Sequence, residues 1–424
     1  MKIGNFSKGR TATVLIFLFT VAVSLTACNL FSSKIQADDL MADISADKVN
    51  GKQADNHFIS STADFSIELF KQTISSEENT LISPLSVMIA LAMTANGADN
   101  QTLTQMENVL GKDILLEDLN EYLFTYISSL PNEKKSKLTI VNSIWFRDDE
   151  GRLKVEKDFL QKNADYYKAA AYKSAFDSQT LKDINEWVKT NTDGMIDKIL
   201  DEINVDAVMY LLNAIVFDAE WETVYNKTDI HKGDFTAFDG SKQTVEFMNS
   251  KEHFYLDDGK AVGFIKPYVN DAYSFLALLP NEDVPVEDYV AALSGSRFTE
   301  MIKNAERTTV TADLPKFSYE YSVSMNDALK NLGMPDAFSA KRADFRRLGQ
   351  SARGNIFVYE VLHKTFINVD ELGTKAGAVT KVEVHDESAA LEMKYVRLDR
   401  PFIYSIIDNA TGLPLFIGIV KSIA

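Results

Sequence analysis

The side chains able to carry out catalysis are few and scattered in this chain of 424 residues. A serine hydrolase presents its nucleophile in a Gly-x-Ser-x-Gly turn, and the nearest approach, residues 349–354 (GQSARG), is one residue too long. The five histidines show no metal-ligand spacing, and there is no His-Glu-x-x-His, P-loop or Gly-x-Gly-x-x-Gly motif. Paired carboxylates such as Asp257-Asp258 are typical of a solvated surface in an acidic chain. The sequence therefore predicts no enzyme, no metal site and no cofactor.

The single cysteine, Cys28, ends a segment typical of an export signal. A basic start is followed by an apolar run over residues 13–25, short for a membrane span, and then by small residues before Cys28. This resembles the lipobox of a bacterial lipoprotein, which implies that residues 1–27 are removed and that Cys28 takes a diacylglycerol. We then expect an exported protein anchored by lipid to the bacterial cell membrane, facing the extracellular side. The alternatives are an ordinary signal peptide and an uncleaved anchor helix.

The remaining composition limits the partners and the means of stabilisation. Without a second cysteine, the body has no disulfide and no thiolate metal site, so its core must hold the fold together. The net charge of −17 argues against nucleic acid or an anionic membrane surface as a partner. Residues 28–56 are polar and rich in Asp and Lys, and we expect a flexible tether with a reach of roughly 30 Å. Residues 57–424 are enough for one large domain or two ordinary ones.

Residues 371–393 carry the pattern of a buried strand in a stretch that otherwise resembles an exposed loop. Every second residue is small, apolar or β-branched: Thr374, Ala376, Ala378, Thr380, Val382 and Val384. The residues between them are mostly polar: Lys375, Gly377, Val379, Lys381, Glu383 and His385. This period of two is typical of a strand with one buried face, yet the pattern ends in the loop-like residues 386–390.

The elements that must position this segment mix helices and strands without a regular alternation. Helical spacing covers four segments: 64–73, 84–95 after the capping Ser83, 116–130 and 182–188. Strand-like runs cover 137–146 and 207–217, and the second is apolar nearly throughout, as in the middle of a sheet. The C-terminal residues 401–420 predict two buried strands joined by a turn at 408–412. The pattern predicts an α+β fold with mainly antiparallel or mixed sheets.

Several segments, in order, resemble the serpin family of protease inhibitors. They are 79–106 (NTLISPLSVM at its start), 184–200 (INEWVKTNTDGMIDKIL), 211–222 (LLNAIVFDAEWE), 313–318 (DLPKFS), 332–338 (LGMPDAF), 361–378 (VLHKTFINVDELGTKAGA) and 399–420 (DRPFIYSIIDNATGLPLFIGIV). The resemblance covers residues 57–424. It implies a fold of three β-sheets with eight or nine helices and an exposed reactive loop over residues 371–396.

The resemblance also explains the strand pattern in the loop. Serpins offer the loop as bait to a serine protease, and the cleaved loop inserts into the main sheet as an extra strand. The protease is then trapped as a covalent one-to-one acyl-enzyme, and the inhibitor, expected to be a monomer, is consumed. The residues implied as the hinge of the loop are small or at its start: Glu371, Gly373, Thr374, Ala376, Gly377 and Ala378. Gly373 is expected to supply backbone freedom for a turn.

Other positions acquire roles by the same resemblance. Glu371 is expected to pair with Lys316 near the top of the opening sheet, beside Trp221. A polar cluster beneath the centre of the sheet, where the strands must part, is implied for Ser83, Ser86, Asn213 and His363. In a purely structural interpretation, the serines cap a helix, the amide is buried with its hydrogen bonds formed, and the histidine belongs to the core. The two interpretations coincide, because a hydrogen-bonded cluster that can separate serves both purposes.

The bait bond has two placements. Counting from Glu371 puts it between Glu387 and Ser388, which suits a glutamyl-specific protease. Counting back from Pro401 puts it after Ala390, before Leu391, and cuts around Ser388 or Ala389 would suit an elastase-like or subtilisin-like enzyme. The loop has no Arg or Lys between 382 and 393, which argues against a trypsin-like target.

Two alternatives to an inhibitor remain open. A non-inhibitory serpin, acting as a carrier or chaperone, tends to have bulky, charged or proline residues in the hinge, where this chain has Thr374 and Ala376. A lipid-anchored solute-binding protein would have two α/β lobes. Activation by heparin is not expected, because residues 116–130 hold three acidic residues and no Lys or Arg.

Overall fold

The computed structural model describes residues 35–148, 153–204, 206–352, 354–374 and 393–423. Contacts divide the chain into two units, Met1–Gln36 and Ala37–Ala424, and the sheets and helices belong to the second. Within the described residues, no helix combines the length and the apolar character that a membrane span needs. The predicted signal peptide, Cys28 and loop residues 375–392 lie outside the described residues.

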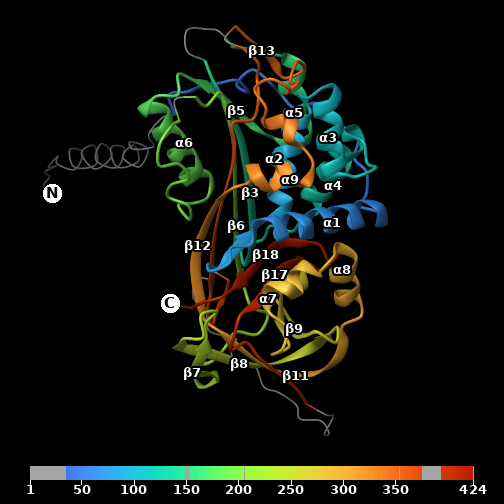
Figure 1. Ribbon diagram of the computed structural model, residues 1–424, viewed down its shortest axis with the longest axis vertical. Coiled ribbons are helices and arrows are strands. Elements are labelled where there is room, and N and C mark those ends of the chain that lie inside the picture. The colour runs from blue at the N-terminus through green and yellow to red at the C-terminus, as the bar shows by residue number, and fades with distance from the viewer. Residues whose placement is uncertain (1–34, 149–152, 205, 353, 375–392, 424) are drawn as a thin grey trace, which may run out of the picture. The chain divides into compact units, whose positions relative to one another are not determined.

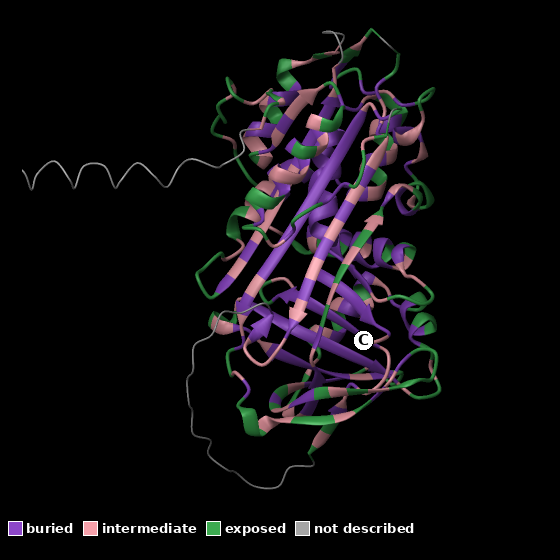
Figure 2. Ribbon diagram, turned by 90° about the vertical axis from the view of Figure 1, so that its left-hand side faces the viewer, coloured by how far each residue is buried: buried purple, intermediate pink, exposed green. Residues whose placement is uncertain are grey.

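A seven-stranded sheet occupies the centre of this unit (Figure 1). In spatial order its strands are β1 (Asp38–Asp39), β5 (Ala170–Ser174), β3 (Ser136–Arg147), β6 (Met209–Glu220), β15 (Gly373–Thr374), β14 (Glu360–Val369) and β12 (Phe317–Ser324). The prediction that the apolar run at 207–217 lies in mid-sheet is confirmed, since β6 pairs with β3 on one side and with β14 and β15 on the other. Strand β6 is buried along nearly its whole length, whereas β3, β14 and β12 also carry partly or fully exposed residues, as the banded strands of Figure 2 show.

Two further sheets complete the strands of the described residues. The larger contains, in order, β16 (Lys394–Arg397), β11 (Glu306–Pro315), β8 (Lys242–Asp257), β9 (Ala261–Pro267), β10 (Tyr273–Pro280), β17 (Phe402–Asp408), β18 (Pro414–Val420) and β2 (Thr80–Ile82), with β7 (Ile230–Thr236) beside β8. The smaller pairs β13 (Gly349–Ser351) with β4 (Leu153–Val155). The predicted C-terminal hairpin is confirmed, because β17 and β18 pair antiparallel.

Nine α-helices lie within the described residues. They are α1 (Asn56–Thr73), α2 (Pro84–Ala95), α3 (Asn100–Leu110), α4 (Leu116–Ser129), α5 (Lys157–Tyr167), α6 (Ser178–Asn191), α7 (Val286–Ala291), α8 (Gly295–Lys303) and α9 (Asn326–Leu332). Helices α2 to α5 and α9 gather on one side of the seven-stranded sheet and α6 lies on the other (Figure 1). Every residue of α2 is buried, as expected for a helix that is apolar all round. The α+β fold with three sheets and nine helices confirms the predicted class.

The flexible tether predicted over residues 28–56 is wrong for its second half. Residues 38 and 39 add a short strand to the edge of β5, and the Leu40 N–H donates to the Ala171 carbonyl at 2.9 Å. Several apolar side chains of this segment pack against the core: Leu40, Met41, Ile44 and Ala54. Asp55 then caps α1 by accepting the Phe58 N–H at 2.9 Å. A few apolar residues and one unpaired sheet edge are enough to order a segment whose composition predicts a coil.

Candidate functional site

Residues 370–374 contain the described members of the predicted hinge, Glu371, Gly373 and Thr374. They form the hinge segment, at which the predicted loop leaves the seven-stranded sheet. Thr374 of β15 pairs with Ala219 of β6 on one side and with Val369 of β14 on the other, antiparallel to both. Its side chain is 2% exposed, and its hydroxyl lies 2.5 Å from that of Tyr268. The start of the loop therefore already occupies the place of a strand between β6 and β14.

Gly373 is required here for a reason that differs from the predicted turn. Its backbone does not adopt a positive φ. A Cβ at this position would lie 2.0 Å from the carbonyl oxygen of Ala219, which is well inside contact distance. Glycine is needed because β15 approaches β6 too closely for any side chain.

An ion pair between Glu371 and Lys316 also holds the hinge. The Glu371 carboxylate lies 2.7 Å from the Lys316 ammonium, as the resemblance implies, and Lys316 also reaches Glu246 at 3.0 Å. The hydrogen bond from Lys316 lowers the pKa of Glu371. Both partners are partly exposed, so the pair orients the hinge more than it stabilises the protein.

Backbone carbonyls of three consecutive hinge residues accept hydrogen bonds from one neighbouring segment. The Trp221 indole N–H donates to the Asp370 carbonyl at 2.9 Å, and its backbone N–H donates to Leu372 at 2.9 Å. The Tyr225 N–H donates to the Glu371 carbonyl at 3.0 Å. The Trp221 ring stacks on Tyr268 with ring centroids 4.6 Å apart. Trp221, Tyr225 and Tyr268 together form the hinge clamp, which holds residues 370–372 where the loop begins.

Below the hinge, β6 and β14 pair directly with each other, and the predicted polar cluster lies against this junction. The Ser83 N–H donates to Nε2 of His363 at 3.0 Å, and His363 Nδ1 lies 2.7 Å from Asn213 Oδ1. The Asn213 amide donates to the Ser86 carbonyl at 2.6 Å and to Asn142 at 2.5 Å. The structure thus brings all four predicted residues together and adds Asn142.

The geometry decides the protonation of His363. Because the Ser83 N–H can only donate, Nε2 accepts and Nδ1 carries the proton, which it donates to Asn213. The imidazole is neutral, and burial lowers the pKa of His363 to about 3. The cluster joins the start of α2 to both β6 and β14, so a separation of these two strands would break its hydrogen bonds.

Three site residues, Asn142, Tyr225 and Tyr268, were not singled out in the sequence. Asn142 alone had a signal, because it is an isolated amide in the apolar run of β3 (KLTIVNSIWF). The two tyrosines stand in segments whose contact with the hinge depends on the folding of distant strands. Tyr268 lies far from Thr374 along the chain, and only the meeting of the two sheets brings their hydroxyls together.

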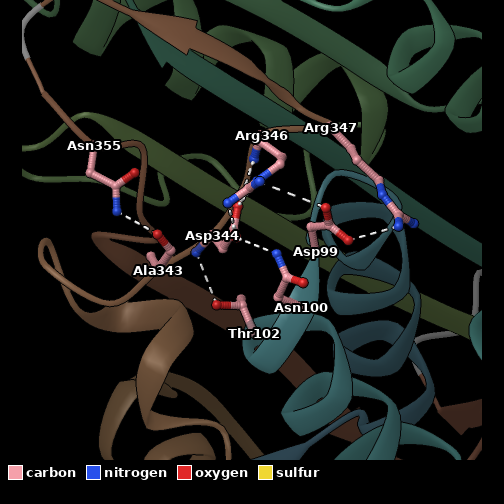
Figure 3. Close-up of polar contacts among 8 residues, drawn as sticks. All are labelled: Asp99, Asn100, Thr102, Ala343, Asp344, Arg346, Arg347 and Asn355. Atoms are coloured by element: carbon pink, nitrogen blue, oxygen red, sulfur yellow. Dashed lines mark hydrogen bonds and ion pairs between the residues drawn. The ribbon is translucent and has the colours of Figure 1, made fainter.

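Basic residues of segment 341–347, which precedes β13, form ion pairs within the fold (Figure 3). Arg346 and Asp344 pair at 2.7 Å, Arg347 and Asp99 pair at 2.7 Å, and the Asp344 N–H donates to the Thr102 hydroxyl at 2.9 Å. These contacts fix the segment leading into β13 against α3, beside a polar cavity of about 670 Å³. Ser351, from the motif that falls short of a hydrolase turn, lies within β13.

Among the described residues, no three His, Cys, Asp or Glu side chains group as they would to hold a metal ion. The site consists of three features. Strands β6 and β14 pair directly, the loop begins between them at Thr374, and the His363 cluster lies against their paired residues.

Comparison with known proteins supports the same description. The family model described as "Serpin (serine protease inhibitor)" matches residues 60–423. Human neuroserpin is 27% identical over 373 residues, which cover 84% of this chain and 89% of neuroserpin.

Two solved structures of a thermophilic serpin, tengpin, are similar to the chain as a whole. Its native state is 58% identical, covers 92% of this chain and 100% of its own, and has a TM-score of 0.89. Its latent state, also 58% identical, covers 88% and 100% of the two chains with a TM-score of 0.79.

Proposed function

The chain belongs to the serpin family, and from that premise we propose that it is an irreversible suicide-substrate inhibitor of serine proteases. Serpins generally act as inhibitors and not as catalysts. The family also removes the solute-binding alternative, since a large mixed sheet replaces the two lobes that such a protein needs. An inhibitor of this kind needs a loop that can insert and a sheet that can accept it, so that the protease is trapped.

The register of β15 is the observation that carries the proposal. Thr374 lies between Ala219 and Val369 and runs antiparallel to both strands. Moving six residues along the loop to Thr380 moves six residues back along each strand, to Asn213 and His363. These two residues are already paired with each other in the closed sheet. The strands β6 and β14 therefore need only separate, with no sliding, to accept the loop.

The side chains of the loop suit this register. Residues that share the parity of buried Thr374 are small or β-branched, so they can face the core as the strand forms. Insertion of residues 375–384 adds about ten backbone hydrogen bonds, worth on the order of 10 kcal/mol at roughly 1 kcal/mol each. This is comparable to the stability of a whole domain, so the uncut protein is held in a kinetic trap.

The chemistry is performed by the protease. Its serine oxygen attacks the bait carbonyl, the peptide bond breaks, and the new amine leaves with the C-terminal fragment while an ester joins protease and loop. Insertion then carries the ester and the attached protease along the sheet before water can hydrolyse the ester. The protein supplies the bait, the sheet that opens and the free energy of insertion.

We place the bait bond between Glu387 and Ser388, with a glutamyl-specific protease as the target. Cuts at Ala389 or Ala390, before Leu391, by an elastase-like or subtilisin-like enzyme are the alternatives. The hinge-side count governs this choice, because the length of loop that inserts decides how far the protease is carried.

The test mixes the protein from Asn29 onward with a glutamyl-specific and an elastase-like serine protease. Denaturing gels and intact masses should show a stable one-to-one adduct and a released peptide, Ser388–Ala424 for the preferred bond. The control uses each protease with its catalytic serine replaced by alanine, which should give neither product. Cleavage without an adduct by both active enzymes would show a substrate-like or non-inhibitory serpin, and the carrier or chaperone would become the better hypothesis.

We also propose that residues 1–27 are removed and that Cys28 anchors the protein by lipid to the extracellular side of a bacterial membrane. The support is the apolar run and the small residues before the only cysteine. In cells fed a labelled fatty acid, the full chain should become labelled and Cys28→Ser should not. A labelled Cys28→Ser variant, or an unlabelled parent chain in the membrane fraction, would remove the lipid from the proposal.

A further inference from the structure

A buried ion pair lies directly beneath the hinge clamp. The Lys266 side chain on β9 is 3% exposed and the Glu252 side chain on β8 is 6% exposed, and their charged groups are 2.9 Å apart. Removing two charges from water is costly, and apolar side chains in their place are often neutral or stabilising. The pair therefore calls for an explanation other than the stability of the fold.

The Lys266 ammonium is surrounded by groups that fix its position. Besides Glu252, it reaches the Thr223 carbonyl at 3.3 Å and lies over the rings of Tyr225 at 4.4 Å and Trp221 at 5.3 Å. Burial by itself lowers the pKa of Lys266, but the interactions with Glu252 and Tyr225 together outweigh burial and the net pKa is raised, so the side chain stays charged. A charged ammonium attracts the faces of both rings.

The same network continues through Tyr225. The Tyr225 hydroxyl lies 3.3 Å from the Ser250 hydroxyl, which donates to Glu252 at 2.6 Å. Lys266 thus contacts both Thr223 and Tyr225, while Glu252 reaches Tyr225 through Ser250. The segment from Trp221 to Tyr225 is the one whose N–H groups hold the carbonyls of hinge residues 370–372.

We propose that Lys266 is a positioning residue that, through Trp221 and Tyr225, keeps the hinge of the uncut loop from entering the sheet further. This rests on the proposed function, because a hinge needs holding only if the loop can insert. Without the ammonium, the clamp rings lose their common partner and the Thr223 carbonyl loses its donor. The uncut protein should then convert faster to an inserted form that no longer offers its loop.

The test measures this conversion without requiring any trapped protease. The protein from Asn29 onward is incubated at a fixed temperature, and aliquots are scored for loop cleavage by a protease on gels and for unfolding by urea. The main variant is K266M/E252M, which removes both charges and leaves no unpaired buried carboxylate. It should keep the urea midpoint of the uncut form near that of the parent and lose cleavable loop about tenfold faster. K266R, which keeps the charge, should restore a rate close to that of the parent.

A matched control lies elsewhere in the same fold. Lys421 is also fully buried and bound to a carboxylate, Glu287, and to the carbonyls of Ser75 and Ser76, away from the hinge. K421M should lower the urea midpoint and leave the conversion rate of the folded protein unchanged. An unchanged rate in K266M/E252M, or an equal rise in K421M, would overturn the role of Lys266. A parent protein cleaved without any adduct would instead overturn the inhibitory function while leaving the conversion rates measurable.

Discussion

Thr374 occupies a position with room for a small side chain and for one polar contact. It is buried between Ala219 and Val369, and its hydroxyl meets the Tyr268 hydroxyl. A charged side chain in this place would have to lose its water without a partner, which costs several kcal/mol. In the proposed mechanism, a side chain that does not fit this position would slow insertion and reduce trapping.

We expect Thr374→Arg to convert the protein from inhibitor to substrate. The reason is that Thr374 already begins the strand between β6 and β14, so an arginine there would disrupt this start and slow the insertion of the residues that follow, which gives water time to hydrolyse the acyl-enzyme. The measurement is the number of inhibitor molecules cleaved per protease trapped, which should rise by about tenfold or more for a delay of roughly 1.4 kcal/mol. Val379→Arg is the matched control, since its parity assigns it to the solvent face, and its ratio should stay near that of the parent. An unchanged ratio for Thr374→Arg would contradict insertion from the hinge.

His363 contributes a pH dependence whose sign follows from its burial. The pKa is about 3 in the folded protein and the ordinary value is 6.5, so between these values the unfolded chain holds a proton that the native protein does not. Stability from this residue is complete above about pH 6.5 and falls as the pH drops, by about 1.4 kcal/mol per unit.

His363→Gln should remove this component of the pH dependence, because an amide can accept from Ser83 and donate to Asn213 without titrating. The check compares urea midpoints of the uncut protein at pH 4.5 and pH 7.5. The loss on acidification should be smaller in His363→Gln than in the parent. His57→Gln, at an exposed position on α1, should behave as the parent does. Equal losses in parent and His363→Gln would contradict the neutral buried imidazole.

At the scale of elements, α6 covers the seven-stranded sheet on the side away from the other helices (Figure 1). Its start is capped by Asp177, whose carboxylate accepts the N–H groups of Gln179 and Thr180 at 2.9 and 3.0 Å. The Asp177 N–H in turn donates to the Thr180 hydroxyl at 3.2 Å, which completes a capping box. The hydrogen bond from Thr180 lowers the pKa of Asp177, so the cap is fully formed only when this carboxyl is ionised.

Asp177→Ala should lower the free energy of unfolding by about 1 kcal/mol, the usual value of an N-cap. Urea unfolding at pH 7 measures this change. Asp201→Ala is a suitable control, because its pair with Lys198 is exposed and should contribute little. A loss no larger than that of the control would show that α6 does not depend on its cap.

At the scale of the whole molecule, the seven-stranded sheet is closed at the place where the proposed insertion would occur. The strands β6 and β14 pair with each other over residues 210–214 and 360–364, where the register would admit the loop. The hinge clamp, the Glu371–Lys316 pair and the His363 cluster all cross or border this junction. Together they oppose an opening that the inserted strand would make favourable.

Cleavage in the loop should therefore make the protein more stable. The expected rise in the thermal midpoint is on the order of 10–20 °C, since about 10 kcal/mol is gained. Calorimetry before and after complete cleavage, with masses to confirm the cut, measures it. Thr374→Arg, cut in the same way, should gain less. A midpoint that does not move after cleavage would show that the loop stays outside the sheet.

Much of the element order could be predicted from the chain because local patterns were strong. The apolar run of β6, the serine and proline before α2 and the alternation after Thr374 each reflect one physical requirement that neighbouring residues satisfy. The start of α1 was predicted eight residues late, at 64 instead of 56, because buried Ser61 and Thr62 interrupt its apolar face. The order of residues 37–55 was also missed, because their burial depends on an edge strand far along the chain.

The sequence by itself determined that residues 374–384 can become a strand with one small-residue face, and by resemblance it identified the residues around the opening. Only the tertiary structure decided that β6 and β14 pair in the register that the proposed insertion requires, with Asn213 opposite His363. Only it placed Lys266 and Glu252 beneath the clamp and gave Gly373 its steric reason. Side-chain alternation is a local property of a chain, whereas register and burial of charge depend on strands brought together from distant parts of the sequence.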